Sequence, residues 1–143
     1  MSKVAQARRV RNGLMVAVLA MHPIRLKNFA ALEIGRSLVE IKGSWWIVLS
    51  ASETKEDRPD ERRIDDLLQP ALYRYLKKYR PLLAGADQST VPALWLSSND
   101  GAPMSYAGVE RVITETTRAT IGVAQPASLQ NLNRFQRGYS RRR

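Results

Sequence analysis

A predicted β-hairpin constrains the fold of this chain more than any other sequence feature. Residues 37–41 have the two-residue period of a strand, and Lys42-Gly43-Ser44 has the composition of a turn. The run after the turn is apolar and rich in β-favouring side chains, so residues 45–50 are predicted to form the second strand. A short third strand at residues 61–64 would complete a small antiparallel sheet.

Helical patterns precede the hairpin. In residues 5–20 and just after them, apolar side chains recur at spacings of 4, 4 and 3, which indicates a helix: Val10, Leu14, Val18 and Met21. Pro23 ends that helix or begins the next one. Residues 24–33 are predicted to form a short second helix, which Gly35 would stop.

Two further helices are predicted after the sheet. Residues 67–83 place an apolar stripe on one helical face: Leu72, Tyr75, Leu76, Tyr79 and Leu83. Their cations lie mostly off that stripe: Arg74, Lys77, Lys78 and Arg80. Residues 93–96 form a brief buried segment, and Ser105 can cap a last helix that runs to about Thr120. The apolar stripe of this last helix is Val109, Val112, Ile113 and Thr116.

The predicted fold class is a mainly helical α+β domain, with a small three-stranded antiparallel sheet packed against helices. The chain has 143 residues, which suits one domain. It has no cysteine and one histidine, His22, so a thiolate or histidine-rich metal site is excluded and no metal or cofactor is expected. No apolar run approaches the roughly 20 residues of a membrane span, and a cytoplasmic protein is expected.

The charge balance suggests a polyanionic partner. Lys and Arg total 23 against 13 acidic residues, which gives a net charge of +10. Residues 1–12 contribute +4 and residues 125–143 contribute +5, so the middle of the chain is nearly neutral at +1. Two solvated basic ends on a neutral domain account for the charge equally well.

An ordered set of segments resembles the catalytic domain of tyrosine recombinases, the phage-integrase family. Residues 11–32 resemble the family's first conserved box, in which an apolar helix leads through a tight turn to an arginine that opens the next helix. Glu53-Thr54-Lys55 resembles the hairpin lysine. Residues 68–81 and 93–105 resemble the helix after the sheet and the turn before the following helix. The resemblance covers residues 10–124, so residues 1–124 are predicted to be a partial catalytic domain.

The resemblance implies roles in DNA strand exchange, in which a tyrosine attacks a DNA phosphodiester. Arg25 would stabilise the charge on the nonbridging oxygens, because a guanidinium offers a planar bidentate fork. Lys55 would protonate the leaving 5′ oxygen as general acid. Arg25, Lys55 and Arg58 are the predicted DNA-binding residues, and Arg25 and Lys55 should converge on one groove beside the sheet. The alternatives are a surface arginine near a helix start and a solvated loop lysine.

The sequence departs from the family pattern in two respects. Many members carry an acidic residue three positions after the arginine; here it is Asn28, whose amide can still orient the guanidinium. The family's later His-x-x-Arg box and its tyrosine are not found after Ala124. His22-Pro-Ile-Arg25 matches the His-x-x-Arg pattern but precedes the sheet, so His22 is interpreted as a locally packed turn residue. Tyr139 is interpreted as a coincidental match to the nucleophilic tyrosine. The chain is therefore expected to be catalytically inactive.

A frameshift would explain the tail. Residues 125–131, Gln-Pro-Ala-Ser-Leu-Gln-Asn, can be encoded CAG CCC GCA TCT CTT CAG AAC, and dropping the first base yields Ser-Pro-His-Leu-Phe-Arg-Thr. We hypothesise that residues 125–143 are a basic, disordered frameshift product. Missing later helices would leave an apolar surface around Val109, Val112 and Ile113 exposed, through which the chain would self-associate. Binding to DNA would be weak and directed to phosphates.

Two other hypotheses remain open from the sequence. The first is a small basic nucleic-acid-binding accessory protein whose ends grip phosphates. It predicts that deleting residues 125–143 abolishes binding, whereas Arg25→Ala has little effect. The second is a relic of a recombinase with no partner.

Overall fold

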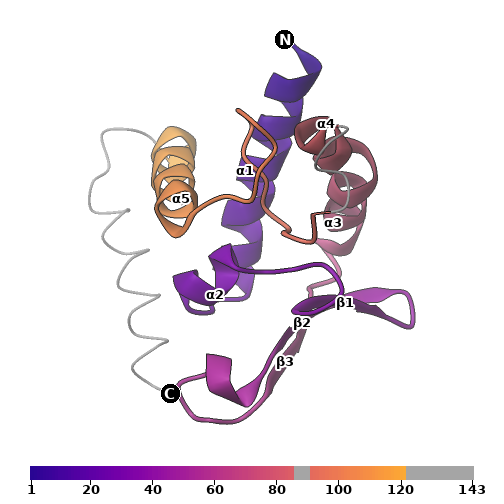
Figure 1. Cartoon of the computed structure of the whole chain (residues 1–143), viewed down its shortest axis with the longest axis vertical. Helices are drawn as coiled ribbons and strands as arrows, with labels where there is room; N and C mark the ends of the chain where they lie inside the picture. The colour runs from indigo at the N-terminus through magenta and orange to yellow at the C-terminus, as the bar shows by residue number, and fades with distance from the viewer. Residues whose placement is uncertain (86–90, 122–143) are drawn as a thin grey trace.

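The structure is a computed structural model that describes residues 1–85 and 91–121, so the predicted tail 125–143 lies outside the described residues (Figure 1). In chain order the elements are α1 (Lys3–Met21), α2 (Leu26–Ala30), β1 (Leu38–Ile41), β2 (Ser44–Leu49), η1 (Ala51–Glu53), β3 (Asp60–Arg63), α3 (Gln69–Arg74), η2 (Tyr75–Tyr79), α4 (Arg80–Ala84) and α5 (Tyr106–Ile121). Helix α1 runs through the middle, with α3 and α4 on one side, α5 on the other and the sheet at one end (Figure 1). The predicted α+β class is confirmed.

Helix α1 has 19 residues and is slightly longer than predicted. It begins after Ser2, whose hydroxyl accepts a hydrogen bond from the Ala5 N–H at 3.0 Å. Its buried face carries Ala7, Arg11, Leu14, Met15, Val18 and Leu19. Met21, predicted to belong to the apolar stripe, is 41% exposed. Arg11 lies in the buried face, so one of the four cations counted at the N-terminal end does not face solvent.

The predicted hairpin is confirmed. Strands β1 and β2 pair antiparallel with Leu38 opposite Ile47, and both of these side chains are buried. Lys42 and Gly43 join the strands, and both have positive φ, 52° and 81°, as a two-residue hairpin turn requires. Strand β3 pairs antiparallel with β2, which is therefore the central strand of the three.

Helix α2 is shorter than the predicted helix 24–33. The chain leaves the helix at Ala31 because the following residues pair with the segment after residue 90. Ile34 N–H donates to the Pro92 carbonyl at 2.8 Å, and Leu94 N–H donates to the Leu32 carbonyl at 2.9 Å. These bonds tie the end of α2 to the buried segment Leu94–Leu96, which the sequence did predict.

The predicted helix 67–83 is not a uniform α-helix, because its middle five residues, Tyr75–Tyr79, form a π-helical turn. Pro81 explains the wider turn, since proline has no N–H and its ring crowds the carbonyl four residues earlier in an α-helix. The N–H of Arg80 bonds to the Tyr75 carbonyl, the five-residue step of a π-turn. Arg80 was predicted to lie off the apolar stripe, but the wider turn brings it inward and its exposure is 8%.

Helix α5 begins as predicted. The Ser105 hydroxyl accepts a hydrogen bond from the Gly108 N–H at 3.0 Å. Val109 and Ile113 are buried, and Val112 is partly buried against the same core. The prediction of an exposed apolar surface at these three residues is therefore wrong, because this face of α5 packs against α1 and α2. Within the described residues, none of the helices is both long and apolar enough to cross a membrane.

Candidate nucleic-acid interface

Arg25 stands where the chain enters α2, as the resemblance implied. It occupies the N-cap position, with φ −57° and ψ 134°, and its side chain is exposed. Pro23 and Ile24 just before it are buried. Among the described residues, the guanidinium of Arg25 makes no hydrogen bond or ion pair, so it is accessible to a ligand from solvent.

The core fixes the helix that follows Arg25. Phe29 is fully buried, and its ring lies 5.3 Å from the ring of Trp95. The Trp95 indole N–H also donates to the Phe29 carbonyl at 3.1 Å. Since α2 is a single short helix of five residues, its position depends on these contacts more than on its own hydrogen bonds.

Lys55 lies in the connection between β2 and β3. Hydrogen bonds among the side chains and backbone of that connection hold its shape. Glu53 accepts hydrogen bonds from both the backbone N–H and the hydroxyl of Ser50, each at 2.9 Å, and so caps η1. The Thr54 hydroxyl donates to the Arg58 carbonyl at 2.6 Å and accepts from the Arg58 N–H at 3.1 Å. The exposed Lys55 therefore projects from a loop of defined shape.

Two long-range hydrogen bonds bring the turn of Arg25 beside the loop of Lys55. The Asn28 side-chain amide donates to the Glu53 carbonyl at 2.7 Å. The Arg62 guanidinium donates to the Pro23 carbonyl at 3.3 Å and is itself held by Asp60 at 3.0 Å. Asn28 was expected to orient the guanidinium of Arg25; instead it positions the loop, and no hydrogen bond joins it to Arg25 within the part of the chain described.

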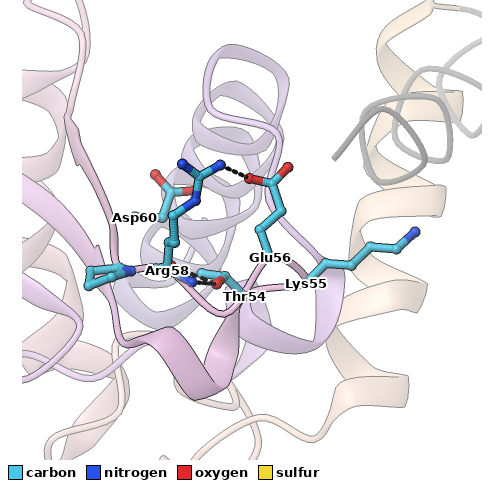
Figure 2. A pocket seen from close by; sticks show the side chains of 6 residues that line it. Thr54, Lys55, Glu56, Arg58 and Asp60 are labelled. Atoms are coloured by element: carbon cyan, nitrogen blue, oxygen red, sulfur yellow. Dashed lines mark hydrogen bonds and ion pairs between the residues drawn. The ribbon is translucent and has the colours of Figure 1, made fainter.

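The loop surrounds a small hollow of about 200 Å³, shown in Figure 2. Its lining is Thr54, Lys55, Glu56, Arg58, Pro59 and Asp60. Lys55 extends away from the ion pair that Arg58 makes with Glu56 at 2.9 Å (Figure 2). Arg25 does not line this hollow, so the convergence of Arg25 and Lys55 on one groove stays a prediction.

The third predicted DNA-binding residue, Arg58, is already partnered. Its side chain is 78% exposed, and a solvent-exposed ion pair of this kind contributes little free energy. A phosphate could therefore replace Glu56 as the partner of Arg58 at small cost. The acidic residues of the loop make this part of the site electrostatically mixed rather than uniformly basic.

No sequence pattern pointed to Arg36 or Arg62, which position the site. Arg36 bonds to Glu33 at 2.6 Å and to Glu53 at 3.4 Å. The hydrogen bond with Glu33 raises the pKa of Arg36, and the hydrogen bond from the Ser50 backbone lowers the pKa of Glu53. No local sequence motif marks either arginine, because each bonds to a residue far away along the chain. Arg36 bonds to Glu53, and Arg62 bonds to Pro23, which is 39 residues away.

His22 ends α1 as a turn residue, as predicted, but its side chain does not bond locally: its partner, Asp65, lies 43 residues further along the chain. The Nε2 of His22 accepts a hydrogen bond from the Asp65 N–H at 2.9 Å, and burial lowers the pKa of His22. Among the described residues, no group of three or more His, Cys, Asp and Glu side chains could hold a metal ion.

Comparisons with protein-family models, with curated proteins and with solved structures each found no match.

Proposed function

We propose that this chain is part of a tyrosine-recombinase catalytic domain that binds DNA phosphates at Arg25 and Lys55 but does not complete strand exchange. Arg25 would hold the nonbridging oxygens of a phosphodiester, and Lys55 would approach the same linkage from the loop. Arg58 would contact a neighbouring phosphate after releasing Glu56. This activity implies a compartment that contains DNA, the cytoplasm in our proposal.

One observation carries the proposal: the hydrogen bond between Asn28 and the Glu53 carbonyl. It joins the helix that Arg25 begins to the loop that presents Lys55. A solvated arginine and a solvated lysine would need no such link between their elements. The order of the elements, from α1 through the three-stranded sheet to α5, is also the order of the segments in the resemblance.

The missing chemistry limits what the site can do. Guanidinium and ammonium groups can hold a phosphodiester and neutralise its charge. Cleavage would also need an activated phenol, and the sequence offers none in the family's later box. The expected activity is therefore weak, salt-sensitive binding to duplex DNA.

The test is the double variant Arg25→Gln/Lys55→Gln in the full chain, with binding to a fluorescent 20-base-pair duplex measured by anisotropy across a salt series. Each phosphate contact contributes about one unit to the slope of log affinity against log salt. The double variant should therefore lower that slope by about two and weaken binding at low salt.

A matched control replaces two exposed arginines of α5, Arg111→Gln/Arg118→Gln, which changes the net charge equally. It should retain most of the wild-type slope. The proposal would be refuted if Arg25→Gln/Lys55→Gln bound the duplex with the wild-type affinity and the wild-type salt dependence. If replacing the five arginines of residues 125–143 by glutamine then abolished binding, the accessory-protein hypothesis would stand instead.

A further inference from the structure

A second cationic surface lies on α3 and η2, away from the candidate interface. It consists of Tyr73, Arg74, Lys77 and Lys78, and we call it the Tyr73 face. All four residues are exposed, and Tyr73 is 53% exposed. In Figure 1, α3 lies on the opposite side of α1 from α5, and well separated from α2. The Tyr73 face therefore needs an explanation of its own.

The three cations of the Tyr73 face have no acidic partners among the described residues. Residues 67–85 contain four basic side chains and no acidic one. The acids that flank this segment in sequence are Asp65 and Asp66 before it and Asp87 after it; Asp66 is paired with Arg63 at 2.6 Å, and Asp87 lies outside the described residues. Three like charges within two helical turns repel one another, so an anion bound across them would relieve that repulsion.

Tyr73 supplies a different kind of contact. The ammonium of Lys77 lies 5.7 Å from the centroid of its ring. An exposed tyrosine next to a cation is typical of surfaces on which a base stacks while its phosphates meet basic side chains. A duplex keeps its bases paired and stacked, so no base of a duplex is free to stack on the tyrosine, and only its phosphates can contact this surface.

The helix presents this surface rigidly. On the opposite side of the same turns, the Tyr75 hydroxyl donates to the Leu94 carbonyl at 2.9 Å. At the start of α3, the Gln69 side chain bonds to both the N–H and the carbonyl of Trp45, at 2.9 and 3.1 Å. Binding at the Tyr73 face would therefore order few protein groups beyond the four side chains themselves.

We propose that the Tyr73 face binds single-stranded nucleic acid, with one base stacked on Tyr73 and adjacent phosphates held by Arg74, Lys77 and Lys78. This inference does not depend on the proposed recombinase identity, because it uses different residues and a different form of nucleic acid.

The experiment measures the affinity of the full chain for a fluorescent 20-nucleotide oligothymidine and for a 20-base-pair duplex. Tyr73→Leu should weaken single-strand binding roughly tenfold, because stacking on an aromatic ring is lost, whereas Tyr73→Phe should retain it. Duplex binding should be the same in both variants. The triple variant Arg74→Gln/Lys77→Gln/Lys78→Gln should lower the single-strand salt slope by about two, at about 0.7 per phosphate.

A control of equal charge change is Lys42→Gln/Arg111→Gln/Arg118→Gln, whose residues are exposed and lie on other elements. The proposal would be overturned if both triple variants lost single-strand affinity equally. It would also be overturned if Tyr73→Leu bound the oligothymidine as tightly as the wild type does. Binding of the wild type to anionic phospholipid vesicles in preference to the oligonucleotide would also overturn it. Arg25→Gln/Lys55→Gln should leave single-strand binding intact, so this proposal and the recombinase proposal can fail separately.

Discussion

One ring nitrogen of His22 links the C-terminal end of α1 to the loop that leads into α3. Nε2 can accept the hydrogen bond from the Asp65 N–H because it carries no proton there. Protonation of Nε2 would convert this acceptor into an N–H donor that faces the Asp65 N–H, and the hydrogen bond would be lost. Burial lowers the pKa of His22, and the nearby Asp65 carboxylate offsets part of that effect. The neutral ring is therefore the form that the folded state prefers.

Stability should consequently depend on pH through this residue. Because the folded-state pKa is below the unfolded value of about 6.5, the unfolded chain binds the proton more readily. The stabilisation is fully present above about pH 6.5 and is lost as the pH falls through the folded-state pKa. Urea unfolding at several pH values between 7.5 and 5 should show this loss in the wild type.

The His22→Gln variant provides the comparison, since glutamine keeps an oxygen acceptor but does not titrate in this range. The gap between the two unfolding free energies should change as the pH falls, with the wild type losing more. Parallel curves for the two proteins would show that the link to Asp65 is not sensitive to protonation.

Among the elements, the helical run from α3 to α4 and the segment at residues 91–96 depend on each other. Three buried side chains donate to carbonyls of that segment: Arg11 to Leu96 at 2.7 Å, Tyr75 to Leu94, and Arg80 to Val91 and Ala93. Burial lowers the pKa of both arginines, and no ion pair compensates their charge within the described residues. Backbone carbonyls of the segment are the partners of Arg80, whereas Arg11 divides its hydrogen bonds between the Leu96 carbonyl and the side-chain oxygen of Asn12.

Tyr75→Phe isolates one of these bonds. The variant leaves the Leu94 carbonyl without its donor inside the core, and keeps the ring contact with Trp95. We expect a loss of about 1–2 kcal/mol in the free energy of unfolding, measured by urea denaturation. Tyr73→Phe changes the same group on the exposed face of the same helix and should alter stability by less than about 0.5 kcal/mol. Equal effects for the two variants would contradict the account of the buried bond.

Local patterns predicted the elements, and long-range contacts explain where the prediction failed. The turn at Lys42 and Gly43 was evident because its composition and the flanking strands agree. The π-turn was missed although Pro81 lies inside the predicted helix, since the apolar stripe alone suggested an unbroken helix. Arg25 and Lys55 could be placed on a turn and a loop, but the bond from Asn28 to Glu53 joins residues 25 positions apart. No spacing rule reveals such a bond.

The molecule as a whole separates its two proposed binding surfaces across α1. Arg25 and Lys55 belong to α2 and the connection between β2 and β3, whereas the Tyr73 face belongs to α3 and η2 (Figure 1). The net charge of +10 would favour the approach of nucleic acid to either proposed surface. Binding at one surface would leave the other accessible.

The distribution of tyrosines argues that the proposed binding would not lead to covalent chemistry. Of the five tyrosines, Tyr75 and Tyr79 are buried, and burial raises the pKa of Tyr75 far above its ordinary value. Tyr73 and Tyr106 are exposed, and neither lies on α2 or the loop of Lys55. Tyr139 lies outside the described residues. Incubation with a nicked suicide duplex, which traps a phosphotyrosyl intermediate, should therefore give no adduct that survives denaturing electrophoresis. An adduct that forms with the wild type and disappears in Tyr139→Phe would contradict the inactivity we propose, because it would identify that tyrosine as the nucleophile.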